Sequence, residues 1–526
     1  MKSGLPVILA ALALAAVARA FPIAGVIVDA QSGSPLRRAR IVLTPAKSGS
    51  TPMSLVVGDA GRFSFEVPDG RYSLAAEYRG VRQIFGLQGP GLGFGVSIIT
   101  GADHDTGHLT FRWFAPGAIT GTVVDDRGEP VEGALVQLIR SMVAAGRKRL
   151  VTAGWFWTDD RGVYRFGPVT GGTYYLAVTG APWYVGQAAL PRMPDQPSEP
   201  TAAYAPNYYP GASDLAGASP VILEAGGEVR ADFTLRTTTG VRVIVNCPNA
   251  EGRSGMLSLV ADGVEGPAGF QRQLNFYGMR QTIPAVPPGR YQVHLAGGGE
   301  NPFSARKTID VASTDVTVEL ALQPPPSVSG RVVFANPAAR PKSTVYVRLI
   351  DEVDGPLRAR AVETDGSFVF DSVAASKFRA QITHAEGFSI ARISADGATL
   401  KNGVLDVVDG AKVTLSIFAD DDTGQVKGFV MNGDDPVPGV LAVLAPRKES
   451  TDPGDYRGYQ TDSDGSFSWA NIPTGDYMLF AVARLDLEYA NAAAIGPHLA
   501  GGKPIRVERH GTYDERVAVA APAPRN

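Results

Sequence analysis

Residues 461–479 of the chain read TDSDGSFSWANIPTGDYML, and this stretch decides the fold. Its Asp-Ser-Asp-Gly run is typical of a tight turn, because Asp can bond its own backbone and Gly accepts a positive φ. Phe467 and Trp469 then alternate with polar residues, which is the period of a strand with one buried face. A proline and a glycine reverse the chain again, and Tyr477 and Leu479 return along the same face. The stretch therefore predicts a β-hairpin packed against a core.

The same hairpin recurs along the chain, which indicates a repeat architecture. Further copies lie at residues 59–74, 158–176 and 364–378, and 283–293 keeps only the second half. In four copies a tyrosine stands two residues after the glycine of the second turn: Tyr72, Tyr174, Tyr291 and Tyr477. The hydroxyl of each is a candidate to cap the corner by bonding to backbone upstream, as in the tyrosine corner of Greek-key sandwiches. The copy at 364–378 ends at Phe378 without the glycine.

Each unit opens with a Gly-x-Val type of strand, and no amphipathic helix of ten or more residues is convincing after residue 20. The predicted class is all-β, as a tandem array of small Greek-key β-sandwich domains. A chain of 526 residues is too long for one core and should divide into about four or five domains. The predicted boundaries are 21–114, 115–237 with a long loop at 180–220, 238–324 for a divergent unit, 325–420, and 421–526 with a short tail.

Residues 1–20 have the pattern of a secretory signal peptide. Lys2 precedes an apolar stretch, and Ala-Arg-Ala at 18–20 fits a cleavage site, so the protein is predicted to be secreted to the periplasm, the cell surface or the medium. No later stretch has the roughly 20 apolar residues of a transmembrane helix. A net charge of −3 argues against a nucleic-acid partner, which would require a basic face. Cys247 is the only cysteine, so no intramolecular disulfide forms; an inert, partly buried thiol is the main interpretation and a reactive thiol the alternative.

The run ITGTVVDDRGEPVEGALVQL at 119–138, with TDDRGVYRF at 158–166 and GGTYYLAV at 171–178, resembles the carboxypeptidase regulatory-like domain. That domain is a transthyretin-like sandwich of seven strands. The resemblance is good at 23–80, 117–180 and 424–483, lower at 328–385 and weak at 240–295. It rests on turn and core residues, so it is specific for fold rather than for function. Relatives include the B-type repeats of surface adhesins and starch-binding-like sandwiches, which implies scaffold, stalk or recognition roles outside the cytoplasm.

Catalytic motifs are missing from the sequence. In zinc carboxypeptidases the regulatory-like domain follows a large catalytic domain, and no such domain fits here. None of the six histidines forms an H-E-x-x-H motif, and neither a G-x-S-x-G elbow nor a P-loop occurs. We therefore predict that the chain is not an enzyme and needs no cofactor. An accessory or degenerate relative of a zinc carboxypeptidase is a distant alternative.

The proline-rich loop at 180–220 carries five large aromatic residues: Trp183, Tyr184, Tyr204, Tyr208 and Tyr209. Exposed aromatic rings commonly stack on sugar rings or anchor a protein partner. The alternative is that the rings fold back over the sandwich and cover an open edge. The first interpretation makes these residues ligand-binding candidates, and the second makes them structural.

A run of three carboxylates, Asp420, Asp421 and Asp422, falls at a predicted domain junction and is called the acidic triplet below. Clustered carboxylates are calcium ligands, and calcium at junctions rigidifies extracellular arrays. Turns use the same residues for hydrogen bonding, and no stretch has the full EF-hand spacing, so turn chemistry is the main interpretation and calcium the alternative.

These observations favour an exported, non-catalytic multidomain scaffold or adhesin-like binding protein. The alternative is a carbohydrate-binding protein that uses the aromatic loop near 183–209. The expected partner is an extracellular or periplasmic protein or polysaccharide.

Overall fold

The computed structural model describes residues 19–47, 49–87, 89, 95–185, 201–261, 271–299, 301–352, 355–356 and 359–520. Apart from residues 19 and 20, the predicted signal peptide lies outside these ranges, as does the part of the aromatic loop at 186–200. Within the described ranges, no helix has the length and apolar character that crossing a bilayer requires. The chain divides into two compact units: the first sandwich belongs to one, and the four others, except residues 462–464, belong to the second.

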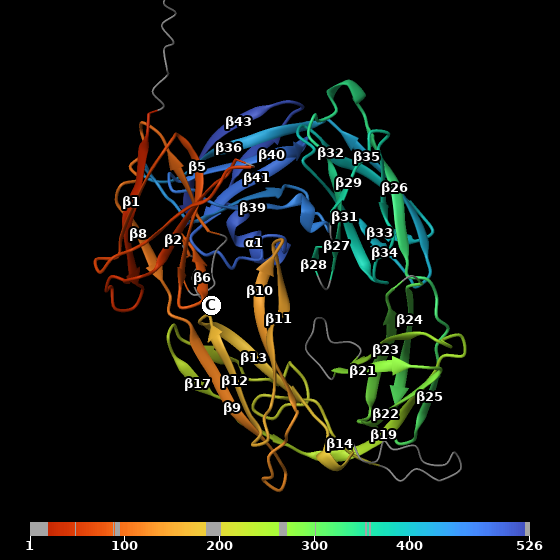
Figure 1. The fold of residues 1–526 in the computed structure, drawn as a ribbon. Helices are drawn as coiled ribbons and strands as arrows, with labels where there is room; N and C mark the ends of the chain where they lie inside the picture. The colour runs from red at the N-terminus through yellow and green to blue at the C-terminus, as the bar shows by residue number, and fades with distance from the viewer. Residues whose placement is uncertain are drawn as a thin grey trace, which may run out of the picture. The chain divides into compact units, whose positions relative to one another are not determined.

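The first sandwich contains strands β1, β2, β5, β6 and β8, labelled in Figure 1, together with β3, β4 and β7. They are β1 (Phe21–Asp29), β2 (Arg40–Pro45), β3 (Met53–Val56), β4 (Arg62–Val67), β5 (Gly70–Tyr78), β6 (Val81–Ile84), β7 (Ser97–Thr100) and β8 (Leu109–Trp113). One sheet has the order β4-β1-β8 and the other β3-β2-β5-β6, with β7 also on β5. Every second residue of β4 is buried, as expected for a strand with one face on the core.

The second sandwich contains the long hairpin of β10 and β11 (Figure 1). Its elements are β9 (Gly117–Asp125), β10 (Leu135–Ala144), β11 (Arg147–Trp157), β12 (Val163–Val169), β13 (Gly172–Thr179), the 3₁₀ turn η1 (Trp183–Val185), β14 (Thr201–Tyr204), β15 (Asn207–Tyr208), β16 (Val221–Leu223), β17 (Glu228–Arg230) and β18 (Phe233–Leu235). One sheet has the order β11-β10-β13-β15, with β16 on β13, and the other β12-β9-β17, with β18 on β9.

One sheet of the third sandwich includes a strand from the aromatic loop, because β14 pairs with the first strand of that sandwich. Its own strands are β19 (Thr237–Asn246), β20 (Ser254–Ala261), β21 (Gln271–Tyr277), β22 (Arg280–Val286), β23 (Gly289–Gly297), β24 (Phe303–Val311) and β25 (Val316–Glu319). The sheets have the orders β14-β19-β22, with β25 on β19, and β21-β20-β23-β24. The loop therefore contributes to a sheet beyond the domain to which the sequence assigned it.

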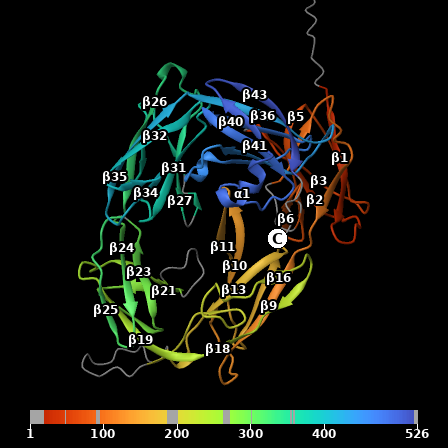
Figure 2. The same cartoon turned by 180° about the vertical axis from the view of Figure 1, so that it is seen from behind.

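Figures 1 and 2 show the fourth sandwich from opposite sides. Its elements are β26 (Ser327–Phe334), η3 (Pro337–Ala339), β27 (Tyr346–Asp351), β28 (Gly355–Pro356), β29 (Arg360–Ala361), β30 (Ser367–Phe370), β31 (Lys377–Thr383), β32 (Ser389–Asp396), β33 (Thr399–Lys401), β34 (Val404–Asp406) and β35 (Lys412–Asp420). The sheets have the orders β30-β26-β35-β32 and β28-β27-β31-β34-β33, with β29 on β27.

The fifth sandwich includes one short helix. Its elements are β36 (Thr423–Asn432), β37 (Asp435–Pro436), β38 (Leu441–Pro446), η4 (Pro453–Asp455), β39 (Arg457–Gln460), β40 (Ser466–Pro473), β41 (Gly475–Val482), α1 (Ala492–Leu499), β42 (Lys503–Val507) and β43 (Thr512–Ala520). The strand order is β37-β36-β43-β41-β38-β39, with β40 on β36 and β42 on β41. Because β43 pairs with both β36 and β41, it joins the two faces along one side. The predicted all-β class of tandem sandwiches is confirmed.

Each sandwich has its own core. The largest clusters of buried apolar side chains in the described residues fall within 23–113, 119–235, 241–322, 328–419 and 426–517. In each sandwich the first strand pairs in parallel with a strand at the end of the same sandwich: β1 with β8, β9 with β17 and β18, β19 with β25, β26 with β35, and β36 with β43.

This parallel pairing explains the glycine of the opening strands. A Cβ at Gly25 would lie 1.9 Å from the carbonyl oxygen of Leu109, and one at Gly428 would lie 1.7 Å from that of Glu515. The last strand therefore approaches the first so closely that only glycine leaves it room.

The predicted tyrosine corners are confirmed. Each of the four hydroxyls donates a hydrogen bond to the carbonyl oxygen four residues upstream: Tyr72 to Pro68 at 3.1 Å, Tyr174 to Thr170 at 2.6 Å, Tyr291 to Pro287 at 2.8 Å and Tyr477 to Pro473 at 3.0 Å. The ring of each tyrosine is buried in the core, and its hydroxyl holds, by this hydrogen bond, the turn that precedes the strand of that tyrosine.

Candidate functional site

Two tyrosines of the aromatic loop are buried. Tyr204 is 4% exposed and Tyr208 is 3% exposed. Tyr208 packs with Ile139 and Ala177 in a small apolar cluster separate from the main core of the second sandwich. Burial raises the pKa of Tyr208, and it raises that of Tyr204 to about 12. The structure corrects the ligand-binding prediction for these two residues, because rings buried in this way pack against the sandwich and offer no face to a ligand.

Tyr209 is also engaged in packing. It lies partly buried against the core of the second sandwich, and its ring meets that of Phe233 edge to face, with centroids 6.0 Å apart. The structural interpretation of the loop therefore holds for its second half.

The first half of the loop is different. Trp183 is 71% exposed and Tyr184 is 47% exposed, both on the 3₁₀ turn η1. Their rings contact each other edge to face, with centroids 5.6 Å apart. Of the five predicted ligand-binding residues, these two are the ones that present aromatic surface to solvent.

Strand β11 carries exposed aromatic residues that the sequence interpretation missed. Trp155 is 68% exposed and Trp157 is 59% exposed. Phe156, between them, points to the other face, where its ring lies 6.3 Å from that of Phe166. The sequence signal was the tripeptide Trp-Phe-Trp at 155–157, which places indoles on alternate positions of one strand.

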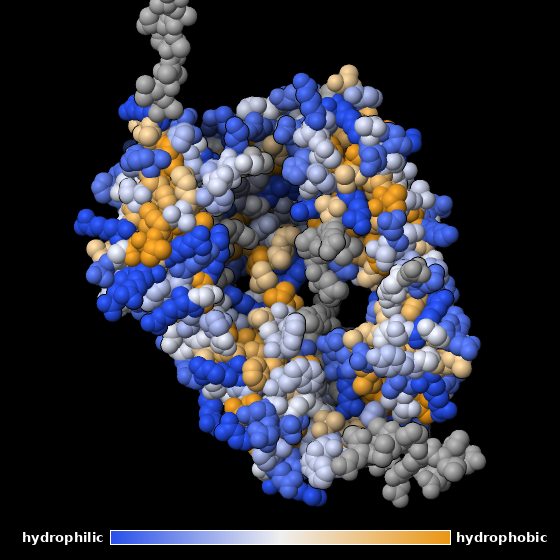
Figure 3. All heavy atoms as spheres, in the orientation of Figure 1, coloured by the Kyte–Doolittle hydropathy of each residue, from blue (hydrophilic) through white to orange (hydrophobic). Residues whose placement is uncertain are grey.

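The second sandwich therefore concentrates exposed aromatic surface. The large aromatic residues most exposed in the described part of the chain are Trp155, Phe156, Trp157, Trp183, Tyr184 and Tyr277. All except Tyr277 belong to the second sandwich. In the view of Figure 3, by contrast, apolar residues occur in small groups between polar ones. The rings lie on two elements, Trp155 and Trp157 on β11 and Trp183 and Tyr184 on η1. Exposed aromatic surface of this kind marks interaction sites in soluble proteins.

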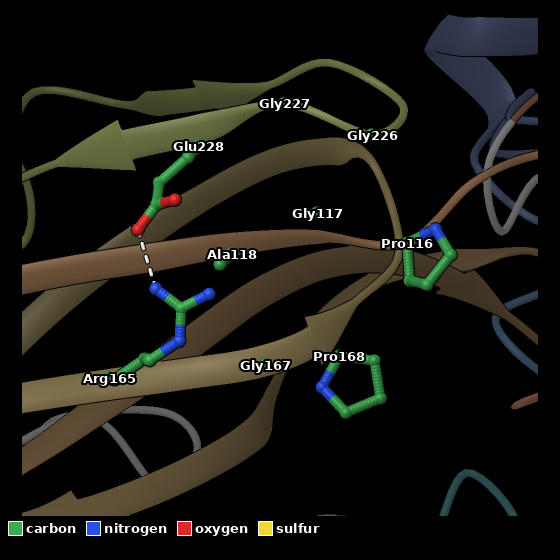
Figure 4. A pocket seen from close by; sticks show the side chains of 9 residues that line it. All are labelled: Pro116, Gly117, Ala118, Arg165, Gly167, Pro168, Gly226, Gly227 and Glu228. Carbon is green, nitrogen blue, oxygen red and sulfur yellow. Dashed lines mark hydrogen bonds and ion pairs between the residues drawn. The ribbon is translucent and has the colours of Figure 1, made fainter. Parts of the chain in front are cut away.

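A hollow of about 350 Å³ lies on the second sandwich (Figure 4). Pro116 and Pro168 stand at one end, and Arg165 and Glu228 form an ion pair of 2.5 Å across the other. Both charged side chains are more than half exposed, so the pair contributes little stability. The rest of the lining is mainly glycine and backbone. With its two charges already paired, the hollow offers no group poised for acid–base or nucleophilic chemistry.

The acidic triplet lies beside a basic residue. Arg509 contacts Asp421 at 2.5 Å and Asp422 at 3.2 Å. Burial alone would raise the pKa of Asp421, but the hydrogen bond from Arg509 holds it below its ordinary value. Burial and the charge of Asp422 raise the pKa of Asp420. Two of the three carboxylates of the triplet are therefore paired with the guanidinium of Arg509.

The described residues hold neither a metal-binding cluster nor an accessible thiol. Among the residues that the structure describes, no group of three or more His, Cys, Asp or Glu side chains is placed to hold a metal ion. Cys247 is fully buried, and burial raises the pKa of its thiol to about 11. A thiol that is neutral and inaccessible at neutral pH is inert, as the sequence indicated.

Comparison with known proteins supports the fold. The carboxypeptidase regulatory-like domain family matches residues 22–84, which lie in the first sandwich. Among the curated proteins, none matches the chain.

Similar solved structures are distant. The minor pilin of Streptococcus agalactiae is 13% identical, with 41% of this chain and 96% of the pilin covered at a TM-score of 0.23. Two B repeat units of the collagen-binding protein of Staphylococcus aureus are 10% identical, with 76% of this chain and 99% of the repeat units covered at a TM-score of 0.13. The major pilin subunit of Bacillus cereus is 13% identical, with 76% of this chain and 98% of the pilin subunit covered at a TM-score of 0.14. At these TM-scores the likeness carries no functional argument.

Proposed function

We propose that the chain is an exported, non-catalytic scaffold of tandem β-sandwiches with an adhesin-like binding surface on its second sandwich. The observation that carries the proposal is the concentration of exposed aromatic rings there, at Trp155, Trp157, Trp183 and Tyr184. When a partner covers exposed indoles, they lose contact with water, and aromatic side chains buried in this way are common anchors of binding interfaces.

The other sandwiches suit a scaffold role. Their distinctive residues, such as the corner tyrosines Tyr72, Tyr291 and Tyr477, serve packing and turns. The predicted domain boundaries are part of the proposal, because each range encloses one large cluster of buried apolar side chains. Export rests on the pattern at residues 1–20, and the partner is a protein or polysaccharide outside the cytoplasm.

A carbohydrate-binding role for the aromatic loop is the second candidate. The exposure of Trp183 and Tyr184 favours it, whereas the burial of Tyr204 and Tyr208 removes two of the five rings on which it was based. The remaining site is one pair of rings in edge-to-face contact.

A retention assay tests the proposal. The chain from Phe21 onward is passed over immobilised cell-wall polysaccharides and extracellular matrix proteins, beside a variant with Trp155, Trp157 and Trp183 replaced by alanine. We expect retention on at least one surface and its loss in the variant. Tyr277→Ala is the matched control, because Tyr277 is 67% exposed on the third sandwich. Equal retention of the triple variant, or loss in Tyr277→Ala, would contradict the proposal.

Catalysis is tested separately. A carboxypeptidase assay with added zinc is expected to give no activity above a heat-inactivated sample. Activity above that control would favour the degenerate-peptidase alternative.

A further inference from the structure

We propose that the face of β11 bearing Trp155 and Trp157 binds a neutral polysaccharide, with successive sugar rings stacked on the two indoles. The inference rests on the proposed binding role of the second sandwich and names the ligand class and the residues.

The geometry provides two parallel stacking positions. Trp155 and Trp157 are alternate residues of one strand, so their side chains leave the same face about 7 Å apart. They lie opposite Gln137 and Leu135 of the neighbouring strand β10. Among the described residues, β11 is the edge strand of its sheet, so no further strand of that sheet lies beside the two rings.

The same edge is poorly suited to an added peptide strand. The register between β10 and β11 shifts at Leu138 and Ile139, where the pairing passes from Gly154 to Thr152. An extra residue at this point, Ala153, bulges out of the ladder next to Trp155. Bulges twist an edge strand and interrupt the row of groups that a new strand would pair with.

The two indoles supply only part of the area that a stable protein interface buries. A Trp side chain has about 150 to 250 Å² to bury, so exposures of 68% and 59% leave roughly 200 to 300 Å² on the two rings. A standard protein–protein interface buries about 800 Å² on each partner. An area of this size instead fits a few sugar rings, whose apolar C–H faces cover an indole while their hydroxyls stay in water.

The charge around the rings indicates a neutral ligand. Neighbouring positions on β11 are Thr152, Ala153 and Gly154, and the opposing residues on β10 are also uncharged. The basic residues of β11 end at Arg149, six positions before Trp155, or about 20 Å along the strand. The turn that follows Trp157 carries Asp159, Asp160 and Arg161, and there Asp159 pairs with Arg161. Within β11 itself, no charged side chain stands between Arg149 and Trp157.

Intrinsic fluorescence can test the inference in the full chain from Phe21. Trp113 and Trp469 are 2% and 7% exposed, so a Trp183→Phe background leaves Trp155 and Trp157 as the exposed indoles. This protein is titrated with cellohexaose, mannohexaose, xylohexaose, chitohexaose and maltohexaose, and with hexagalacturonate as the anionic probe. We expect at least one neutral hexaose to shift emission to the blue and to protect the indoles from acrylamide quenching.

Alanine variants assign the site. Calorimetric titration of that hexaose is expected to show binding weakened about tenfold or more by Trp155→Ala or Trp157→Ala, and unchanged by Tyr277→Ala. Because the replaced rings are exposed, circular dichroism melts should be unaltered. The inference would be overturned if no neutral hexaose binds or if hexagalacturonate alone binds. Undiminished binding in the variant with both Trp155 and Trp157 replaced by alanine would also overturn it. Retention on a protein surface in the preceding assay, lost in the triple variant, would leave the proposed function standing while this inference fails.

Discussion

Removal of one corner hydroxyl, by Tyr291→Phe, tests how the hairpins are held. The ring of Tyr291 is 2% exposed in the core of the third sandwich, and its hydroxyl donates to the carbonyl oxygen of Pro287 at 2.8 Å. Pro287 is itself buried. The substitution deletes one oxygen atom and keeps the ring, so apolar packing is unchanged.

The expected cost follows from that geometry. A typical net hydrogen bond contributes about 1 kcal/mol, and a buried acceptor left without its donor adds to the loss. We expect the free energy of unfolding of the third sandwich to fall by about 1 to 2 kcal/mol, which raises its unfolded fraction roughly 5- to 30-fold.

Cys247 makes the effect measurable in the intact chain. It is the only cysteine, and it is buried in the same core as Tyr291. A disulfide reagent such as DTNB can reach the thiol only when the third sandwich opens, so its labelling rate in mild urea reports that opening alone. We expect Tyr291→Phe to accelerate labelling by about tenfold.

The matched control is Tyr477→Phe, which removes an equivalent hydrogen bond of 3.0 Å in the fifth sandwich. It should leave the labelling of Cys247 at the wild-type rate. If Tyr291→Phe labels no faster than wild type, or if Tyr477→Phe accelerates labelling equally, the corner bond does not stabilise its own sandwich in the way argued.

Three further outcomes are expected. Tyr208→Ala should cost about 3 to 5 kcal/mol and expose the second sandwich to limited proteolysis, whereas Trp183→Ala should leave the cleavage pattern unchanged. The backbone N–H of Val163 lowers the pKa of Asp159, so the stability that Asp159 contributes is present at neutral pH and is lost as pH falls below about 4. Melting curves of Asp159→Ala and wild type should therefore differ at pH 7 and converge in acid; a constant difference would refute this. Because Arg509 pairs with the acidic triplet, calcium should leave the melting temperature unchanged, and a chelator-reversible rise would show otherwise.

The hairpins could be predicted from sequence because local patterning and turn chemistry agree there. The stretch quoted first forms β40 and β41, and its Tyr477 makes the expected bond. The fate of the aromatic loop could not be predicted in this way. Whether Tyr208 covers the sheet or faces water depends on Ile139 and Ala177, which are distant in sequence. The pairing of β14 with β19 is likewise a tertiary contact without a local signal.

The site on β11 was missed for a different reason. The tripeptide at 155–157 is apolar on both faces of its strand, so periodicity cannot say which rings point outward. Which rings face solvent depends on the core, because Phe156 packs beside Phe166 whereas Trp155 and Trp157 remain exposed. The helix α1 escaped notice because it is only eight residues long and contains Pro497.

The parallel pairing of first and last strands determines how each sandwich responds to mechanical force. When the chain is pulled from its ends, tension enters a sandwich through its first strand and leaves, in the opposite direction, through the last. The bonds between these strands are then loaded in shear and must break together, rather than one at a time as in an unzipping hairpin. That ladder joins eight residue pairs between β26 and β35 but four between β19 and β25. In single-molecule pulling, the third sandwich should therefore yield at lower force than the fourth.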